Sequence, residues 1–187
     1  MASNMTPKKA KARMPPHKPP SDFMTILGEM DGTSDRAAAI VSAAFVENNL
    51  ALALISRFHQ LKLVEQEHLF KNLGSLSDFA GKIDLGYALN IYGPLVRDDL
   101  NNVRRIRNAF AHELEVRNFD HPDVAGLCDT LHAPSQLDTA AHPKLPKQRT
   151  HREMYSDTVD HLATRFRLES NAPVGPSRGA HCITGDY

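Results

Sequence analysis

The sequence of 187 residues contains no tryptophan, only two cysteines and no long uninterrupted apolar run. The two cysteines, Cys128 and Cys182, are isolated, so a disulfide framework is not indicated and a reducing compartment is the simpler expectation. The longest apolar stretch, residues 37–46, is about half as long as a membrane span requires. The ten histidines show no tight pairing with cysteine or acidic residues at metal-ligand spacing. We therefore expect a cytoplasmic protein with no metal, no cofactor and no membrane contact.

Acidic residues are absent from the first 21 positions, which sets this segment apart from the rest of the chain. Its five cations are Lys8, Lys9, Lys11, Arg13 and Lys18, and it also holds five prolines. Since the whole chain has 22 basic and 22 acidic residues, the remaining 166 residues carry a net charge of −5. The basic segment lacks the apolar content to pack, and no apolar segment follows it as in a secretory signal. We predict a disordered basic tail over residues 1–21, which either binds nucleic-acid phosphates without reading sequence or only keeps the chain in solution.

The alternation of apolar and polar residues that is typical of β-strands is absent as well. Apolar residues instead recur at helical spacing through the middle of the chain. Ser34 is a good N-cap for the first helix, and Pro94 suits the first turn of a later one. The predicted helices cover residues 34–61, 64–73, about 77–92, 94–114, 122–131 and 148–168, with a proline-containing connector at 133–147. This pattern predicts one all-α domain over residues 22–170, a helical bundle, followed by a loose tail at 171–187.

Charged side chains interrupt the apolar faces of two predicted helices. On an ideal helix Glu47 falls in the middle of an apolar stripe, and Arg107 lies at the edge of another. The first stripe consists of Ile40, Ala44, Ala51, Leu54 and Phe58. A buried carboxylate is costly unless it is paired, so we predict that Glu47 pairs with Arg107, or with Arg104 one turn earlier. The alternative is that Glu47 faces a solvent cleft or a second copy of the chain.

The segment RNAFAH (107–112) carries the residues best suited to chemistry. It places Asn108 directly after Arg107, and His112 five residues after Arg107. At about 100° per residue, the side chains of Arg107 and His112 leave an ideal helix about 140° apart. They would meet only through the length of the arginine, a helix distortion or a second subunit.

This segment resembles the R-x4-6-H motif of the HEPN superfamily. Three blocks in order are similar to the mannitol operon repressor family, whose members are HEPN-like helical proteins. The blocks are SDRAAAIVSAAFVENNLALAL (34–54), LSDFAGKIDLGYALNIYG (76–93) and RRIRNAFAHELEVRNFDHPDV (104–124). The resemblance spans about residues 34–131, roughly half of the chain. It implies an HEPN-like bundle and a role in transcriptional repression of a sugar-alcohol operon.

Three functions remain open on these grounds. A regulator would contact DNA through the basic tail, or act through a protein partner, because the body shows no clear helix-turn-helix recognition face. A metal-independent endoribonuclease would use His112 as general acid or base, Arg107 to stabilise phosphate charge and Asn108 to orient either group, with two motifs facing each other in a homodimer. A small-ligand or nucleotide-binding module ranks last, because GKIDLG (81–86) lacks the spacing of a phosphate loop. We expect the regulator, with the nuclease as the alternative.

Overall fold

The computed structural model describes residues 33–58, 60–71, 73–141 and 148–171, and the regular secondary structure within those ranges is helical. The helices are α2 (Asp35–Ile55), α3 (Leu63–Phe70), α4 (Phe79–Ala88), α5 (Pro94–His112), α6 (Pro122–Cys128), α7 (Ala133–Ala141) and α8 (His151–Asn171). The predicted all-α class is therefore confirmed. The predicted basic tail, with Lys8, Lys9, Lys11, Arg13 and Lys18, lies outside the described residues, as does nearly all of the predicted C-terminal tail.

Local capping explains where most of these helices begin. The Ser34 hydroxyl accepts a hydrogen bond from the backbone N–H of Ala37 at 3.3 Å, so Ser34 is the predicted N-cap of α2. Asp78 does the same for α4, since its carboxylate accepts from the N–H of Gly81 at 2.6 Å. Pro94 occupies the first turn of α5, where a missing N–H costs nothing.

The prediction of a connector over residues 133–147 was wrong in its first part, because Ala133–Ala141 forms α7. Pro134 lies in the first turn of this helix, where proline is tolerated. The backbone N–H groups at the start of α7 are capped by a residue that is distant in the sequence. The carboxylate of Asp99 accepts hydrogen bonds from the backbone N–H of His132 at 2.8 Å and of Ala133 at 3.0 Å. A cap supplied from another helix leaves no local signal.

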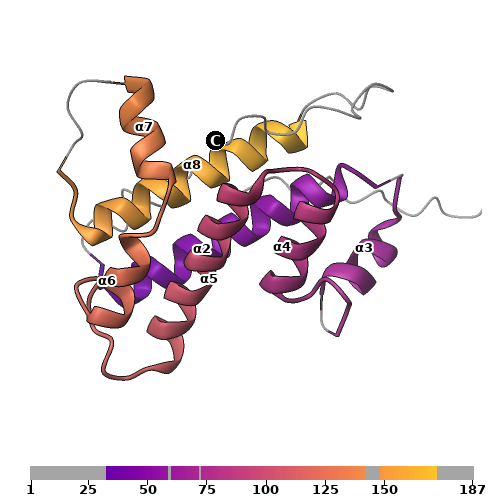
Figure 1. Cartoon of the computed structure of the whole chain (residues 1–187). Helices are drawn as coiled ribbons and strands as arrows, with labels where there is room; N and C mark the ends of the chain where they lie inside the picture. The colour runs from indigo at the N-terminus through magenta and orange to yellow at the C-terminus, as the bar shows by residue number, and fades with distance from the viewer. Residues whose placement is uncertain (1–32, 59, 72, 142–147, 172–187) are drawn as a thin grey trace, which may run out of the picture.

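The helices form a bundle around one central pair. α2 and α8 run side by side through the molecule, and α5 packs across α2 (Figure 1). α4 lies against α2 and α5, α6 joins α5 to α8, and α7 rests on α8. α3 contributes no buried residue, and the ring of its Phe70 meets that of Phe58 with centroids 6.3 Å apart.

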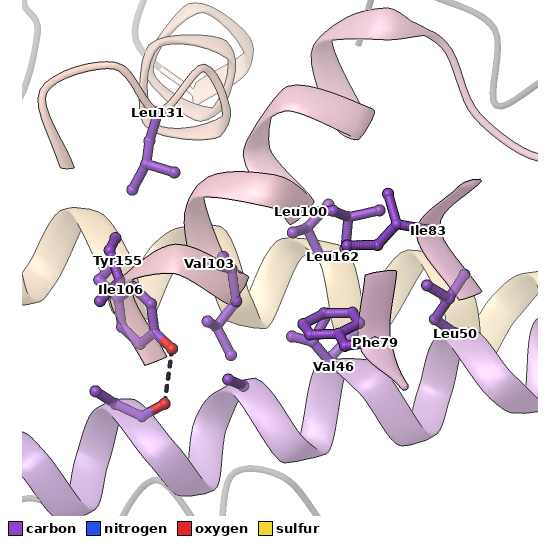
Figure 2. Close-up of a cluster of buried hydrophobic side chains, with 14 of the residues drawn as sticks. Val46, Leu50, Phe79, Ile83, Leu100, Val103, Ile106, Leu131, Tyr155 and Leu162 are labelled. Carbon is purple, nitrogen blue, oxygen red and sulfur yellow. Dashed lines mark hydrogen bonds between the residues drawn. The ribbon is translucent and has the colours of Figure 1, made fainter. Parts of the chain in front are cut away.

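The core lies where α2, α4, α5 and α8 meet (Figure 2). Val46 and Leu50 of α2 and Leu100 of α5 are completely buried there, and each such side chain stabilises the fold by roughly 1.5–3 kcal/mol. The hydroxyl of Tyr155 on α8 donates a hydrogen bond to the carbonyl oxygen of Ala39 on α2 at 2.8 Å, the dashed line of Figure 2. The fold thereby holds α2 and α8 at close distance and presents α5 on their flank.

The buried face of α2 is not the predicted stripe. Of that stripe only Leu54 is fully buried, whereas Ile40, Ala44, Ala51 and Phe58 are half-buried. The apolar residues that are buried instead are Ala38, Ala39, Ala43, Val46, Leu50 and Ala53. α2 is apolar nearly all round, so its periodicity left the orientation undecided.

Among the described helices, α2 alone has the length and composition to cross a membrane, with a mean hydropathy of 1.7 over its apolar window. More than half of that window, 56%, is buried inside the bundle. The core helix of a soluble protein meets the same criteria, so this feature is weak evidence for a membrane span.

Candidate functional site

The residues of the RNAFAH segment lie on the last turns of α5. Val103, Ile106 and Phe110 anchor this part of the helix in the core. On its outer sides, Arg107 and Asn108 are half-buried, and His112 is exposed at the end of the helix. The prediction that this segment is helical is therefore confirmed.

The structure does not bring Arg107 and His112 together within one chain. α5 remains regular from Pro94 to His112, so the two side chains leave its axis about 140° apart, as an ideal helix requires. Within the described part of the chain, neither of them makes a hydrogen bond or ion pair, with the other or with Asn108. One copy of the chain thus presents a cation and an imidazole on different sides of a helix.

The predicted partnership of Glu47 with Arg107 or Arg104 was wrong. Glu47 pairs with Lys82 of α4 at 2.5 Å. The ammonium group of Lys82 also donates to the carbonyl oxygen of Ser77 at 3.0 Å. The Lys82 side chain is only 6% exposed and that of Glu47 17%, so the pair is largely removed from water.

A signal for Lys82 was present in the sequence. Lys82 follows Phe79 by three residues and precedes Ile83, so on an ideal helix it falls within the apolar face of α4. An inward lysine opposite an inward glutamate is a better match than an arginine at the edge of α5. The pair lies between α2 and α4, and it leaves the α5 arginines without the acidic partner that we expected.

Arg104 and Arg107 are cations with unused hydrogen-bonding capacity. The Nε atom of Arg104 is buried and has no hydrogen-bond partner in the described structure. Arg107 has no hydrogen bond or ion pair with any residue that the structure describes. Its charge opposes the rise in the pKa of the Tyr155 hydroxyl that burial and Cys128 cause. Because a guanidinium has five N–H donors, two unpaired arginines one turn apart are suited to bind an anion.

A third arginine, Arg36, binds the C-terminal end of α5, and the sequence analysis did not single it out. Arg36 of α2 donates hydrogen bonds to the carbonyl oxygens of Phe110, of Glu113 at 3.0 Å and of Val116 at 2.9 Å. These carbonyls lie at and beyond the C-terminus of α5, where the helix dipole attracts cations. Arg36 thus satisfies groups of the fold and fixes the chain that follows His112.

Its neighbour Asp35 binds the same loop and α8. The carboxylate of Asp35 accepts from the backbone N–H of Phe119 at 3.1 Å and pairs with Arg152 at 2.6 Å. Asp35 lies in the first turn of α2, where the helix dipole favours an acid. The contacts of Asp35 with Phe119 and Arg152 could not be predicted from the neighbouring residues in the sequence.

The described residues contain no group of three or more His, Cys, Asp or Glu side chains that is arranged to hold a metal ion. In comparisons with known proteins, no protein-family model, no curated protein and no solved structure matches the chain.

Proposed function

We propose that the chain is a non-enzymatic regulatory protein with an HEPN-like bundle, of the kind that its resemblance to the mannitol operon repressor family implies. The observation that supports this proposal is how the charged side chains at the end of α5 are placed. Arg104 and Arg107 have unused donors, whereas His112 lies about 140° away from Arg107 on the same helix. A face of this composition binds an anionic partner, but a single chain does not assemble an acid–base pair around it.

The charge distribution gives the proposal its second part. The body of the chain carries five more acidic than basic residues, whereas residues 1–21 carry five cations and no acid. A net negative body repels nucleic acid at long range. Contact with DNA therefore depends on the tail, and the unpaired arginines of α5 are reserved for an acidic partner protein or for a phosphate once the tail has bound.

Salt-dependent binding to double-stranded DNA tests this proposal. We expect the full chain to bind with an affinity that falls steeply with salt, by a log–log slope of up to about −4.5 for five phosphate contacts. Replacing the five lysines and arginines of residues 1–21 by glutamine should abolish the binding, and Arg105→Gln on the exposed side of α5 serves as a matched control. Binding that survives the loss of all five cations contradicts the proposed role of the tail.

A metal-independent endoribonuclease is the second candidate, and the unpaired Arg107 favours it. In this function His112 of one copy and Arg107 of another would form the site in a homodimer, with His112 moving protons and Arg107 stabilising phosphate charge. Mixing the two inactive variants Arg107→Ala and His112→Ala tests it, because heterodimers would regain one intact composite site. RNA cleavage that reappears on mixing supports the nuclease, and a monomeric chain without cleavage contradicts it.

A further inference from the structure

One side of α2 lies outside the core of the bundle. Every buried residue of this helix lies within about 80° of Val46 around an ideal helix, and Val46 and Leu50 point towards α4 (Figure 2). On the opposite side runs a second row of residues, all exposed or half-buried and all within about 40° of the line opposite Val46. This row, the outer face of α2, consists of Ala37, Val41, Ala44, Asn48, Ala51 and Ile55. A largely apolar face along a whole helix marks a surface for a partner.

The spacing of the outer face is that of a coiled-coil seam. Its members follow one another at alternating intervals of four and three residues, a period of 3.5 that keeps one row turned towards a second helix. Val41, Asn48 and Ile55 thus occupy the a positions of a heptad repeat, and three alanines occupy the d positions. β-branched residues at a favour a two-stranded coiled coil. The alanines are smaller than the usual leucine at d, so the two helices would lie close together and bury less apolar surface.

The charge on this side of α2 matches a second copy of the chain. Between Ala37 and Ile55 the helix contains one ionisable side chain, Glu47, and its carboxylate pairs with Lys82 of α4. A two-fold interface brings identical surfaces together, so any net charge on the face would be repelled by its own copy. The outer face carries none, which suits a second copy and offers nothing to a strongly acidic or basic partner.

Asn48 indicates how the two copies are oriented. It is exposed near the middle of the outer face, and its amide makes no hydrogen bond with any residue that the structure describes. A carboxamide both donates and accepts hydrogen bonds, so two Asn48 side chains at the same level complement each other. They meet at one level when the helices run parallel, and a single Asn at an a position fixes the register of such a pair. In an antiparallel pair centred on Val46, Asn48 would face Ala44 of the other copy.

We propose that the outer face of α2 is a homodimer interface, in which the α2 helices of two copies pack as a parallel two-stranded coiled coil with their Asn48 side chains paired. The face is about 27 Å long and about 10 Å wide, an area of about 300 Å² per copy. A standard interface buries about 800 Å² per partner. The dimer is therefore weak and forms in a concentration-dependent way.

This arrangement has two consequences for the rest of the chain. α5 packs on the buried side of α2, so the contact keeps the two RNAFAH segments on opposite sides of the dimer and differs from the contact that a composite nuclease site needs. Residues 1–21 precede α2, so parallel helices start both basic segments from the same end of the dimer. The dimer contact rests on α2 alone, and only its use in binding DNA rests on the proposed regulatory function.

Sedimentation velocity of the full chain over a series of concentrations tests the interface. We expect the mean mass to rise from that of one chain towards that of two. Val41→Glu places two carboxylates opposite each other in the seam and should weaken association by about tenfold or more. Val64→Glu is the matched control, because Val64 is 75% exposed on α3, away from the face, and this change should leave association unaltered. Circular dichroism shows that each variant keeps its fold.

Disulfide cross-linking tests the orientation. In a Cys182→Ser background, mild oxidation should link two copies of Val41→Cys, whereas Val64→Cys should cross-link far more slowly. An antiparallel pair would hold the two positions 41 about 15 Å apart along the helices, too far for a disulfide. The proposal is overturned if the chain stays monomeric at every concentration, if folded Val41→Glu associates like Val64→Glu, or if Val41→Cys does not cross-link. A monomer in which Val41→Cys resists alkylation would instead assign the outer face to residues 22–32 of the same chain.

Discussion

The two halves of α5 use their charged residues in opposite ways. In the first half Asp99 is completely buried and accepts hydrogen bonds from two backbone N–H groups. In the same half Arg97 pairs with Asp84 at 3.1 Å and lies 4.6 Å from the centre of the Tyr87 ring. In the second half neither Arg104 nor Arg107 has a hydrogen bond or ion pair within the described chain. Asp99 and Arg97 in the first half thus make contacts within the bundle, whereas Arg104 and Arg107 in the second half make no such contact among the described residues.

Among the substitutions on α5 and its neighbours, replacement of Asp99 should lower the free energy of unfolding most. Asp99→Ala leaves two N–H groups at the start of α7 without an acceptor, so we expect a loss of about 4 kcal/mol in the free energy of unfolding. Chemical denaturation with urea measures it. Asp98→Ala, an exposed neighbour on the same helix, is the control, and equal effects of the two substitutions would contradict the assigned role of Asp99.

The second-largest loss of stability is expected when the ion pair between Glu47 and Lys82 is broken. Glu47→Ala leaves a buried ammonium without its carboxylate, which should cost about 3 kcal/mol. A double-mutant cycle assigns the partner: we expect Glu47→Ala and Lys82→Ala to couple by more than about 1 kcal/mol, and Glu47→Ala and Arg107→Ala to be additive. Coupling of Glu47 to Arg107 instead would restore the pairing that the sequence predicted.

Glu47 and Asp99 show how much of the fold could be predicted from the sequence. The Gly93–Pro94 boundary of α5 and the Ser34 cap of α2 depend on adjacent residues, and both were predicted. The partner of Glu47 depends on how α2 is rotated, and a helix that is apolar nearly all round does not encode its rotation locally. The cap of α7 comes from Asp99, 33 positions before His132, so only the folded chain reveals it.

Substitutions in the second half of α5 should barely affect stability. Arg107→Ala removes a side chain with no hydrogen bond in the described structure, so we expect a change of at most about 1 kcal/mol, mainly from lost packing of its aliphatic stem. Arg104→Ala should behave in the same way. Thermal unfolding monitored by circular dichroism provides the comparison with Asp99→Ala. A loss for Arg107→Ala as large as that for Asp99→Ala would mean that Arg107 belongs to the fold.

The smallest expected effect concerns Cys128, which is buried where α5, α6 and α8 meet. Burial, together with the negative charges of Asp129 and Asp120, raises the pKa of its thiol to about 12. A raised pKa stabilises the fold below the ordinary thiol value, and this contribution is lost as the pH rises from that value towards 12. In a Cys182→Ser background, alkylation of Cys128 should therefore be slow at pH 9 in native protein and fast in denaturant. Rapid alkylation of the native protein would show that the thiol is accessible.

Incubation of the purified chain with single-stranded and structured RNA in EDTA tests the central claim, that one chain presents the charges of its motif for binding and not for catalysis. The account predicts no cleavage by the wild type, together with salt-sensitive DNA binding that requires residues 1–21. Metal-independent cleavage by the wild type that is lost in both Arg107→Ala and His112→Ala would contradict it.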